Sequence, residues 1–301
     1  MTIHNSLKFF RDKRNLAQKD VTISDISNYS RIEAGKARVS EEHIKPFANK
    51  LSVSVSELIL YSGFDSDIKE FQNDINAALK QPESTQLQKK IIDRYKKLSK
   101  ISTRNNMELS MYYTIIAIFS NVYPDIPEIC DKDILYTFLH LINLDYYTQF
   151  DYLLALNMTF YYSSDQLLSI SKTMFPLQDP DKRPVDTIKY ANSLMINIIT
   201  MQIYNMDYSA VIQYINLAEK QKLAMENHYY RFLMEYYKHL AKYLQNREES
   251  ELNKTKQYLN IIEDLYDPNT YESFISEHRN LINNPRYYLD LKTFESAKIR
   301  S

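Results

Sequence analysis

Glycine is almost absent from this sequence. Its 301 residues include two glycines, Gly35 and Gly63, and the 238 residues that follow position 63 contain none. Tight β-hairpin turns rely on glycine for backbone conformations with positive φ, so this lack argues against sandwiches, barrels and meanders. It also excludes the GxGxxG fingerprint, the phosphate-binding P-loop and the GxSxG nucleophile elbow, which need closely spaced glycines. The sequence therefore predicts an almost entirely helical chain.

Long apolar runs and paired cysteines are also missing. No apolar run reaches the roughly 18 residues of a membrane-spanning helix, and the start of the chain lacks the apolar stretch of a signal peptide. Cys130 is the single cysteine, so no internal disulfide can form. We therefore expect a reduced, cytoplasmic setting and no membrane association.

Catalytic and metal-binding patterns are lacking as well. The six histidines include no HExxH motif and no pair spaced four residues apart, so no metal site is expected. No nucleophile and base can be matched from the sequence, and no cofactor-binding motif is present. We expect a protein that is not an enzyme and holds no cofactor.

Charge is unevenly distributed along the chain. Residues 1–63 carry ten Lys and Arg against seven Asp and Glu, a net charge of +3, whereas the remaining residues carry −4. A small basic segment joined to an acidic body is an electrostatic indication of a nucleic-acid partner.

The basic segment has the pattern of several short helices. Leu7 and Phe10 lie on the apolar face of a first helix, which ends near Asn15, and a short second helix begins around Ala17. Asp25 is placed to cap a third helix over residues 26–33, which stops at Ala34-Gly35. A fourth helix opens at Ser40, and a fifth follows the run from Leu51 to Ile59. Four or five helices in about 60 residues are typical of a helix-turn-helix domain.

Three parts of this segment resemble the XRE/Cro-type helix-turn-helix: Gln18, the run from Ser30 to Lys36, and the run from Leu51 to Leu58. The interval from Gln18 to Arg31 is shorter than usual, so the second helix must be short. The resemblance implies that the helix over residues 26–33 enters the major groove of double-stranded DNA. It implies base contacts by Ile26, Ser27 and Asn28, and phosphate contacts by Gln18, Arg31, Lys36 and Arg38. The alternative is a basic helical cap without a role in DNA binding.

Helical periodicity recurs from about Phe71 onward. It is interrupted at residues 121–124, 163–165, 205–207 and 246–248, at intervals of 42, 42 and 41 residues. Such regular spacing is typical of stacked helix pairs, each of which buries its apolar face against a neighbour. The interval exceeds the roughly 34 residues of a tetratricopeptide repeat, so the repeats are degenerate.

The predicted fold class is therefore all-α, with an N-terminal helix-turn-helix domain followed by a right-handed superhelix of degenerate TPR-like helix pairs. We expect the helix-turn-helix domain over residues 1–64, a short linker over 65–70, and the repeat domain over 71–301.

Several asparagines interrupt apolar helices of the repeat domain. Asn192 and Asn197 lie in an apolar helix predicted over residues 186–204, and Asn157 follows the apolar run of residues 153–156. Burying an amide costs on the order of 1–3 kcal/mol unless it is paired. An extended peptide on the concave face would pair both ends of such an amide. The alternative is that these amides bond to neighbouring helices.

The combined head and body resemble the Rgg/PlcR/PrgX group of peptide-pheromone receptors. The most specific matches are Met174-Phe175-Pro176, Tyr190-Ala191-Asn192 and Asn205-Met206-Asp207-Tyr208. The resemblance implies a body that dimerises and binds a short secreted peptide after its re-import, which changes how the paired heads sit on DNA. It places Asn157 and Asn192 where family members hold the peptide, and we expect Tyr190, Asn197 and Tyr230 at the same site.

The sequence thus predicts a cytoplasmic, quorum-sensing transcription regulator. Its expected partners are promoter DNA, a short signalling peptide, and a second copy in a homodimer, or a tetramer of paired dimers. Two alternatives stay open: a plasmid- or phage-type repressor without a ligand, and a DNA-tethered scaffold that recruits another protein. With no glycine hinges, the body would switch by sliding of helix pairs or by a change of oligomer.

Overall fold

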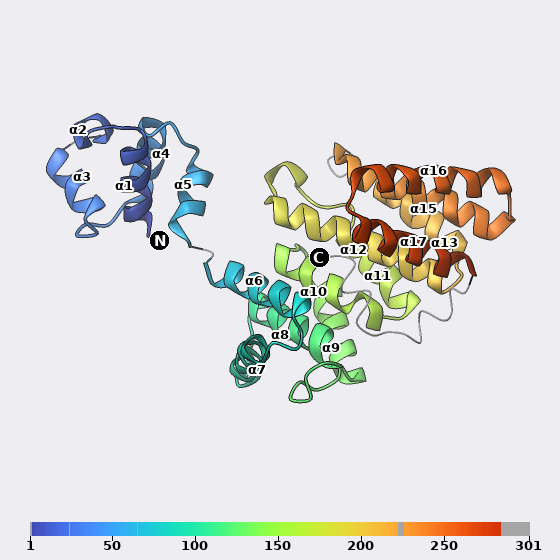
Figure 1. Ribbon diagram of the computed structural model, residues 1–301. Coiled ribbons are helices and arrows are strands. Elements are labelled where there is room, and N and C mark those ends of the chain that lie inside the picture. Colours follow the sequence, from blue (N-terminus) through green and yellow to red (C-terminus); the bar gives the residue numbers. More distant parts are fainter. Residues whose placement is uncertain (1, 24, 65, 222–225, 284–301) are drawn as a thin grey trace. The chain divides into compact units, whose positions relative to one another are not determined.

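The computed structural model describes residues 2–23, 25–64, 66–221 and 226–283 (Figure 1). All secondary-structure elements within these ranges are helices, which confirms the all-α prediction. The chain divides into two compact units, one ending at Asp74 and the other beginning at Ile75. No helix among the described residues is long and apolar enough to cross a membrane.

The first unit, hereafter the head, is built around five short helices. Its helices are α1 (Ile3–Lys13), α2 (Gln18–Val21), α3 (Ile26–Glu33), α4 (Glu41–Lys50) and α5 (Val55–Ser62). All five elements lie where the sequence predicts them, and α2 has only four residues, as the short interval after Gln18 requires. Their apolar faces form one core, made of Leu7, Phe10, Val21, Tyr29, Ile32, Phe47, Ala48, Leu51 and Leu58.

Both ends of α3 are set by local chemistry. The Asp25 carboxylate accepts a hydrogen bond from the backbone N–H of Ser27 (3.1 Å), which caps the first turn. Beyond the last turn, Gly35 adopts φ +71°, a conformation that residues with a side chain rarely adopt. These two features therefore limit α3 to eight residues, the first three of which are predicted to contact bases.

The second unit, hereafter the body, is a stack of helix pairs. Its described helices are α6 (Ser66–Lys80), which begins before the unit boundary, α7 (Thr85–Ser99), α8 (Asn106–Phe119), α9 (Asp131–Ile142), α10 (Gln149–Met158), α11 (Ser164–Met174), α12 (Val185–Tyr204), α13 (Tyr208–Glu219), α15 (His228–Asn246), α16 (Glu249–Leu265) and α17 (Pro268–Asn283). The 3₁₀ turns Thr159–Tyr161 and Pro180–Lys182 precede α11 and α12. Residues 66–70, expected as a linker, belong to the first turns of α6.

The predicted breaks mark the turn inside each helix pair. They fall between α8 and α9, at the start of α11, between α12 and α13, and between α15 and α16. The interval of 41 or 42 residues is therefore the length of one helix pair. The pattern follows because each pair buries an apolar face only by packing against the next one.

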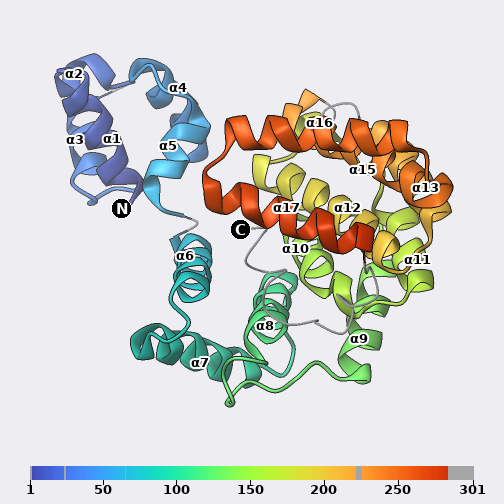
Figure 2. The same cartoon turned by 45° about the vertical axis from the view of Figure 1, so that its right-hand side comes forward.

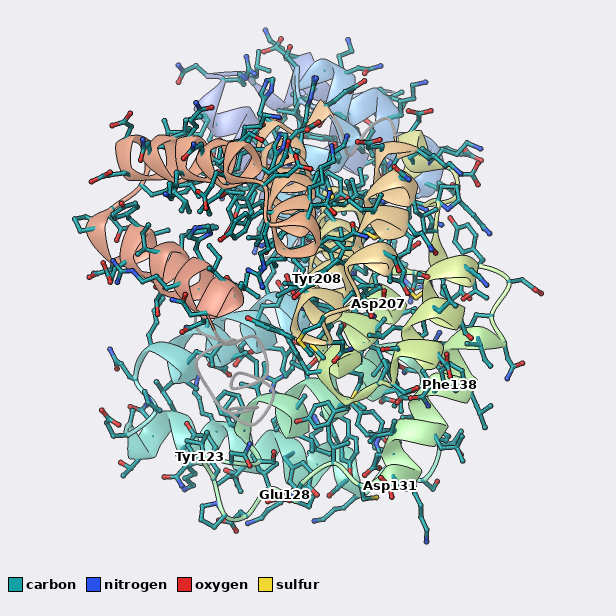
Figure 3. All side chains as sticks on the ribbon, turned by 90° about the vertical axis from the view of Figure 1, so that its right-hand side faces the viewer. Tyr123, Glu128, Asp131, Phe138, Asp207 and Tyr208 are labelled. Atoms are coloured by element: carbon teal, nitrogen blue, oxygen red, sulfur yellow. The ribbon has the colours of Figure 1, made fainter. Side chains whose placement is uncertain are left out.

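The turns that end α12 and α15 require a positive φ, and residues other than glycine adopt it there. Met206 (φ 59°) and Arg247 (φ 60°) adopt the left-handed conformation that glycine usually supplies at a helix end. Such a conformation costs a residue with a side chain roughly 1–2 kcal/mol. Asp207 then starts α13 by accepting a hydrogen bond from the Ala210 N–H (3.0 Å). Figure 3 shows Asp207 and Tyr208 together at this helix start.

Helices α8, α10 and α12 form a row inside the body. Helix α10 packs against both α8 and α12, and Figures 1 and 2 show the three side by side. We call this row the inner layer. The second helices α9 and α11 contact each other in a separate row. Thirteen of the twenty residues of α12 are buried, so α12 is a central element of the body.

Candidate functional site

Helix α3 has one buried and one exposed side. Tyr29 and Ile32 are each 1% exposed and pack into the head core. On the other side, Ile26 is 48% exposed, Ser27 is exposed and Asn28 is half-buried. The three residues predicted to contact bases thus lie on the first turn of α3, where Ile26 and Ser27 are exposed and Asn28 is partly exposed. Ser27 and Asn28 offer polar groups, and Ile26 an apolar one, of the kinds that contact base edges in a major groove.

Three cationic side chains lie at and beyond the end of α3. Arg31, Lys36 and Arg38 are all exposed. None of the three side chains forms a hydrogen bond or ion pair with another residue in the part of the chain that the structure describes. Exposed cations without a protein partner are available to bind DNA phosphates.

Gln18 belongs to a side-chain network under α3. Its Nε2 donates to Oε2 of Glu33 (2.9 Å). Arg11 binds the same carboxylate with two hydrogen bonds, Nε to Oε1 (2.6 Å) and Nη2 to Oε2 (3.0 Å). Its Nη1 donates to the carbonyl oxygen of Leu16 (2.9 Å). One carboxylate from α3 thereby ties α1 and α2 to the recognition helix.

The carboxylate of Glu33 is 7% exposed and stays charged because it is paired. Burial raises its pKa, but the hydrogen bonds from Arg11 and Gln18 outweigh burial and hold the pKa of Glu33 below its ordinary value. The sequence patterns did not indicate this pair. The available signal was the position of Arg11, next to Phe10 on the core side of the first helix.

Asn157 joins two helices of the inner layer. From α10, its Nδ2 donates to Oγ1 of Thr114 on α8 (2.8 Å) and to the carbonyl oxygen of Leu153 (3.0 Å). The side chain is half-buried, and no described residue donates a hydrogen bond to its Oδ1. Its donor is therefore used within the body, while its acceptor has no partner among the described residues.

Asn192 is the least satisfied of the predicted asparagines. It lies on α12 and is 8% exposed, yet its amide forms no hydrogen bond with any residue that the structure describes. The polar atoms of Asn192 keep some contact with solvent, so a ligand backbone could pair both the N–H and the C=O of the amide.

The remaining predicted residues occupy different environments. Tyr190 is half-buried near the start of α12, whereas Asn197 is 4% exposed and Tyr230, on α15, is 1% exposed. The Tyr230 hydroxyl accepts a hydrogen bond from Nε2 of Gln221 (3.5 Å), and burial raises its pKa. Asn197 and Tyr230 are thus interior residues in this conformation. Helix α10, which carries Asn157, packs against α12, which carries Tyr190, Asn192 and Asn197.

Comparison with known proteins matches this architecture to one family. Residues 86–275 match the family model described as the C-terminal domain of the HTH-type transcriptional regulator Rgg. The chain belongs to this family. The expected resemblance is thereby confirmed, and the family is one of transcription regulators rather than enzymes.

Solved structures agree with this Rgg-family fold. A bacterial peptide pheromone/receptor complex is 21% identical, with a TM-score of 0.75, and the match covers 93% of this chain and 98% of that one. The PrgX/cCF10 complex is 22% identical, with a TM-score of 0.75 over 92% and 98% of the two chains. The SHP pheromone receptor Rgg2 of Streptococcus dysgalactiae is 17% identical, with a TM-score of 0.70 over 92% and 99%. No curated protein sequence matches the chain.

Proposed function

We propose that this Rgg-family regulator is cytoplasmic, binds promoter DNA as a homodimer through α3, and is switched by a short signalling peptide held on the inner layer. Gln18, Ile26, Ser27, Asn28, Arg31, Lys36 and Arg38 are the proposed DNA-binding residues, and Asn157, Tyr190, Asn192, Asn197 and Tyr230 are the proposed peptide-binding residues. Two of the similar structures are complexes with a pheromone or a PrgX ligand, which supports the same class of ligand here.

The observation that carries the proposal is the state of Asn192 and Asn157. The two amides lie on adjacent helices of one layer, and Asn192 is buried without a partner in the described chain. Both the donor and the acceptor of Asn192 are open, and Asn157 adds a second open acceptor. A peptide in extended conformation presents alternating N–H and C=O groups at the spacing that such amides can pair.

Peptide binding would act on DNA through the packing of helix pairs. Because the body has no glycine after Gly63 to serve as a hinge, we propose that bound peptide shifts neighbouring pairs by sliding, or changes the oligomer. A tetramer of paired dimers is one such change. The peptide can move the equilibrium only as far as its affinities for the two arrangements differ.

The test compares Asn192→Ala with Asn216→Ala, which removes an exposed amide from α13. DNA binding is measured by fluorescence anisotropy with and without the low-mass peptide fraction of the host's culture medium. We expect Asn192→Ala to lose the response to the fraction and to keep its basal DNA affinity, while Asn216→Ala responds as the unaltered protein does. A full response by Asn192→Ala would remove it from the site.

A further inference from the structure

Helix α7 carries a concentration of positive charge that is unlike the rest of the body. Residues 85–104 contain seven Lys and Arg and one acid, a net charge of +6, although all residues after position 63 together carry −4. The cations are Lys89, Lys90, Arg94, Lys96, Lys97, Lys100 and Arg104. The proposed functions of α3 and the inner layer use none of them.

The opposite side of α7 anchors it firmly to α8. Ile91 is fully buried and Leu98 is 7% exposed. The ring of Tyr95 stacks on Tyr112 of α8, with centroids 5.6 Å apart. Arg104 also packs on Tyr112, with Cζ 4.0 Å from the ring centroid and Nε donating to the Leu98 carbonyl oxygen (2.9 Å). The helix is therefore a fixed platform rather than a loosely attached segment.

Its outward side presents exposed lysines around one exposed acid, Asp93, which is four residues from both Lys89 and Lys97. Lys89, Lys97 and Lys100 are exposed, and their side chains form no hydrogen bond or ion pair with another described residue. Lys96 pairs with Asp125 at 3.5 Å, but both side chains are about half exposed, and such a pair contributes little. At 1.5 Å per residue the row from Lys89 to Lys100 is about 16 Å long.

Helix stability explains these lysines only in part, although Asp93 is spaced to offset the charges of Lys89 and Lys97. Cations in the last turn interact favourably with the helix dipole, which accounts for Lys96, Lys97 and Lys100 taken alone. Lys89 lies near the start of the helix, where the first turn contains no acid and positive charge is unfavourable. Lys96 and Lys100 are like charges four residues apart, an arrangement that costs roughly 0.2–0.5 kcal/mol. The pattern therefore favours an anionic partner.

We propose that this lysine face of α7 is a second DNA-binding surface, which contacts the phosphates of duplex DNA. This inference rests on the proposed DNA-binding function. Duplex DNA carries one negative charge per about 1.7 Å of axis, so a 16 Å row of lysines meets several phosphates. Because α7 and the head belong to one chain, DNA bound by the head is a polyanion to which α7 remains tethered.

The variant that tests the proposal is Lys89→Gln/Lys97→Gln/Lys100→Gln in the full chain. Its affinity for a long duplex of random sequence is measured as a function of salt, between about 50 and 200 mM. Removal of one lysine–phosphate pair should lower the slope of log affinity against log salt by about 0.9, so we expect a reduction of about 2 to 3 for the triple variant. Sequence preference at the operator should be unchanged.

The matched control removes the same charge elsewhere on the body. Lys132, Lys172 and Lys220 are exposed, and their side chains form no hydrogen bond or ion pair with another described residue. The variant Lys132→Gln/Lys172→Gln/Lys220→Gln should therefore keep the slope of the unaltered protein. Equal slopes for the two triple variants would overturn the proposal. Failure of the unaltered protein to bind DNA would instead refute the proposed function itself.

A second arm tests another polyanion. Vesicles of phosphatidylglycerol and phosphatidylcholine are mixed with the unaltered protein and with the α7 variant, and bound protein is separated by flotation. We expect no retention of either protein. If the vesicles retain the unaltered protein but not the variant, and the DNA slope is unchanged, the lysine face binds membranes and the DNA assignment is wrong.

Discussion

The substitution Arg11→Ala should selectively destabilise the head. Arg11 makes two hydrogen bonds to Glu33, at 2.6 and 3.0 Å, and without it the carboxylate loses its cationic partner but keeps the bond from Gln18. Glu33 is 7% exposed, so little water can replace the guanidinium. The variant leaves a buried negative charge beside Ile32, which is part of the core under the recognition helix.

The expected loss follows from known costs of broken buried pairs. Removing one partner of such a pair destabilises a protein by about 3–5 kcal/mol. Because the Gln18 bond remains, we expect about 3 kcal/mol for Arg11→Ala. Replacing both partners with apolar residues is often neutral. The double variant Arg11→Met/Glu33→Leu should therefore lie within about 1 kcal/mol of the unaltered protein, although it lacks the pair entirely.

Native-state hydrogen exchange is the appropriate assay, since it resolves the head amides from those of the body. In the unaltered protein the pKa of Glu33 is lower than in the unfolded chain. The charged carboxylate therefore contributes fully to the free energy of unfolding above its pKa in the unfolded chain. That contribution is lost as the pH falls through its pKa in the folded chain. In Arg11→Ala burial without the cation raises that pKa, so the stability gap should narrow on acidification from neutral pH. A loss below about 1 kcal/mol, or a double variant as unstable as the single one, would refute the reasoning.

Three further predictions concern DNA, peptide and pH. Arg31→Ala should weaken binding to all DNA sequences and lower the salt slope by about 0.9, whereas Asn28→Ala should change sequence preference in a selection from random duplexes; equal effects on both readouts would contradict the groove assignment. Asn157→Leu removes the bond to Thr114 and the open acceptor, so it should abolish the peptide response in the anisotropy assay; a normal response would contradict its role. Burial lowers the pKa of His278 to about 4, so between pH 6.5 and 4 this imidazole binds a proton only in the unfolded chain. The free energy of unfolding should therefore fall by about 3 kcal/mol over that range. Urea unfolding of His278→Gln should lack this fall, and an equal fall in the variant would contradict the prediction.

Most of the fold was predictable from local sequence patterns. The α3 boundaries followed from Asp25 and Gly35, because capping and positive φ depend on single residue types. The helix pairs followed from breaks at regular intervals, because each break marks the turn of one pair. These features depend on neighbours in sequence, so the sequence alone predicts them.

Contacts between distant residues were not predictable in the same way. Arg11 and Glu33 are 22 residues apart, and the position of Arg11 on the core side of the first helix does not identify Glu33 as its partner. Asn157 and Thr114 are 43 residues apart, and their hydrogen bond depends on how α10 packs on α8. The sequence likewise indicated that Asn192 and Asn197 are in an apolar helix, but only packing distinguishes the unpaired amide of Asn192 from the interior Asn197.

The measurement that tests the central claim most directly is anisotropy of the purified full chain on DNA from upstream of its own gene. It is made with and without the low-mass peptide fraction of the host's culture medium, and repeated with Asn192→Ala. The account predicts that the fraction shifts the affinity or stoichiometry of the unaltered protein and leaves Asn192→Ala unmoved. Tight DNA binding with no shift in the unaltered protein would contradict peptide control and favour a repressor without a ligand or a DNA-tethered scaffold.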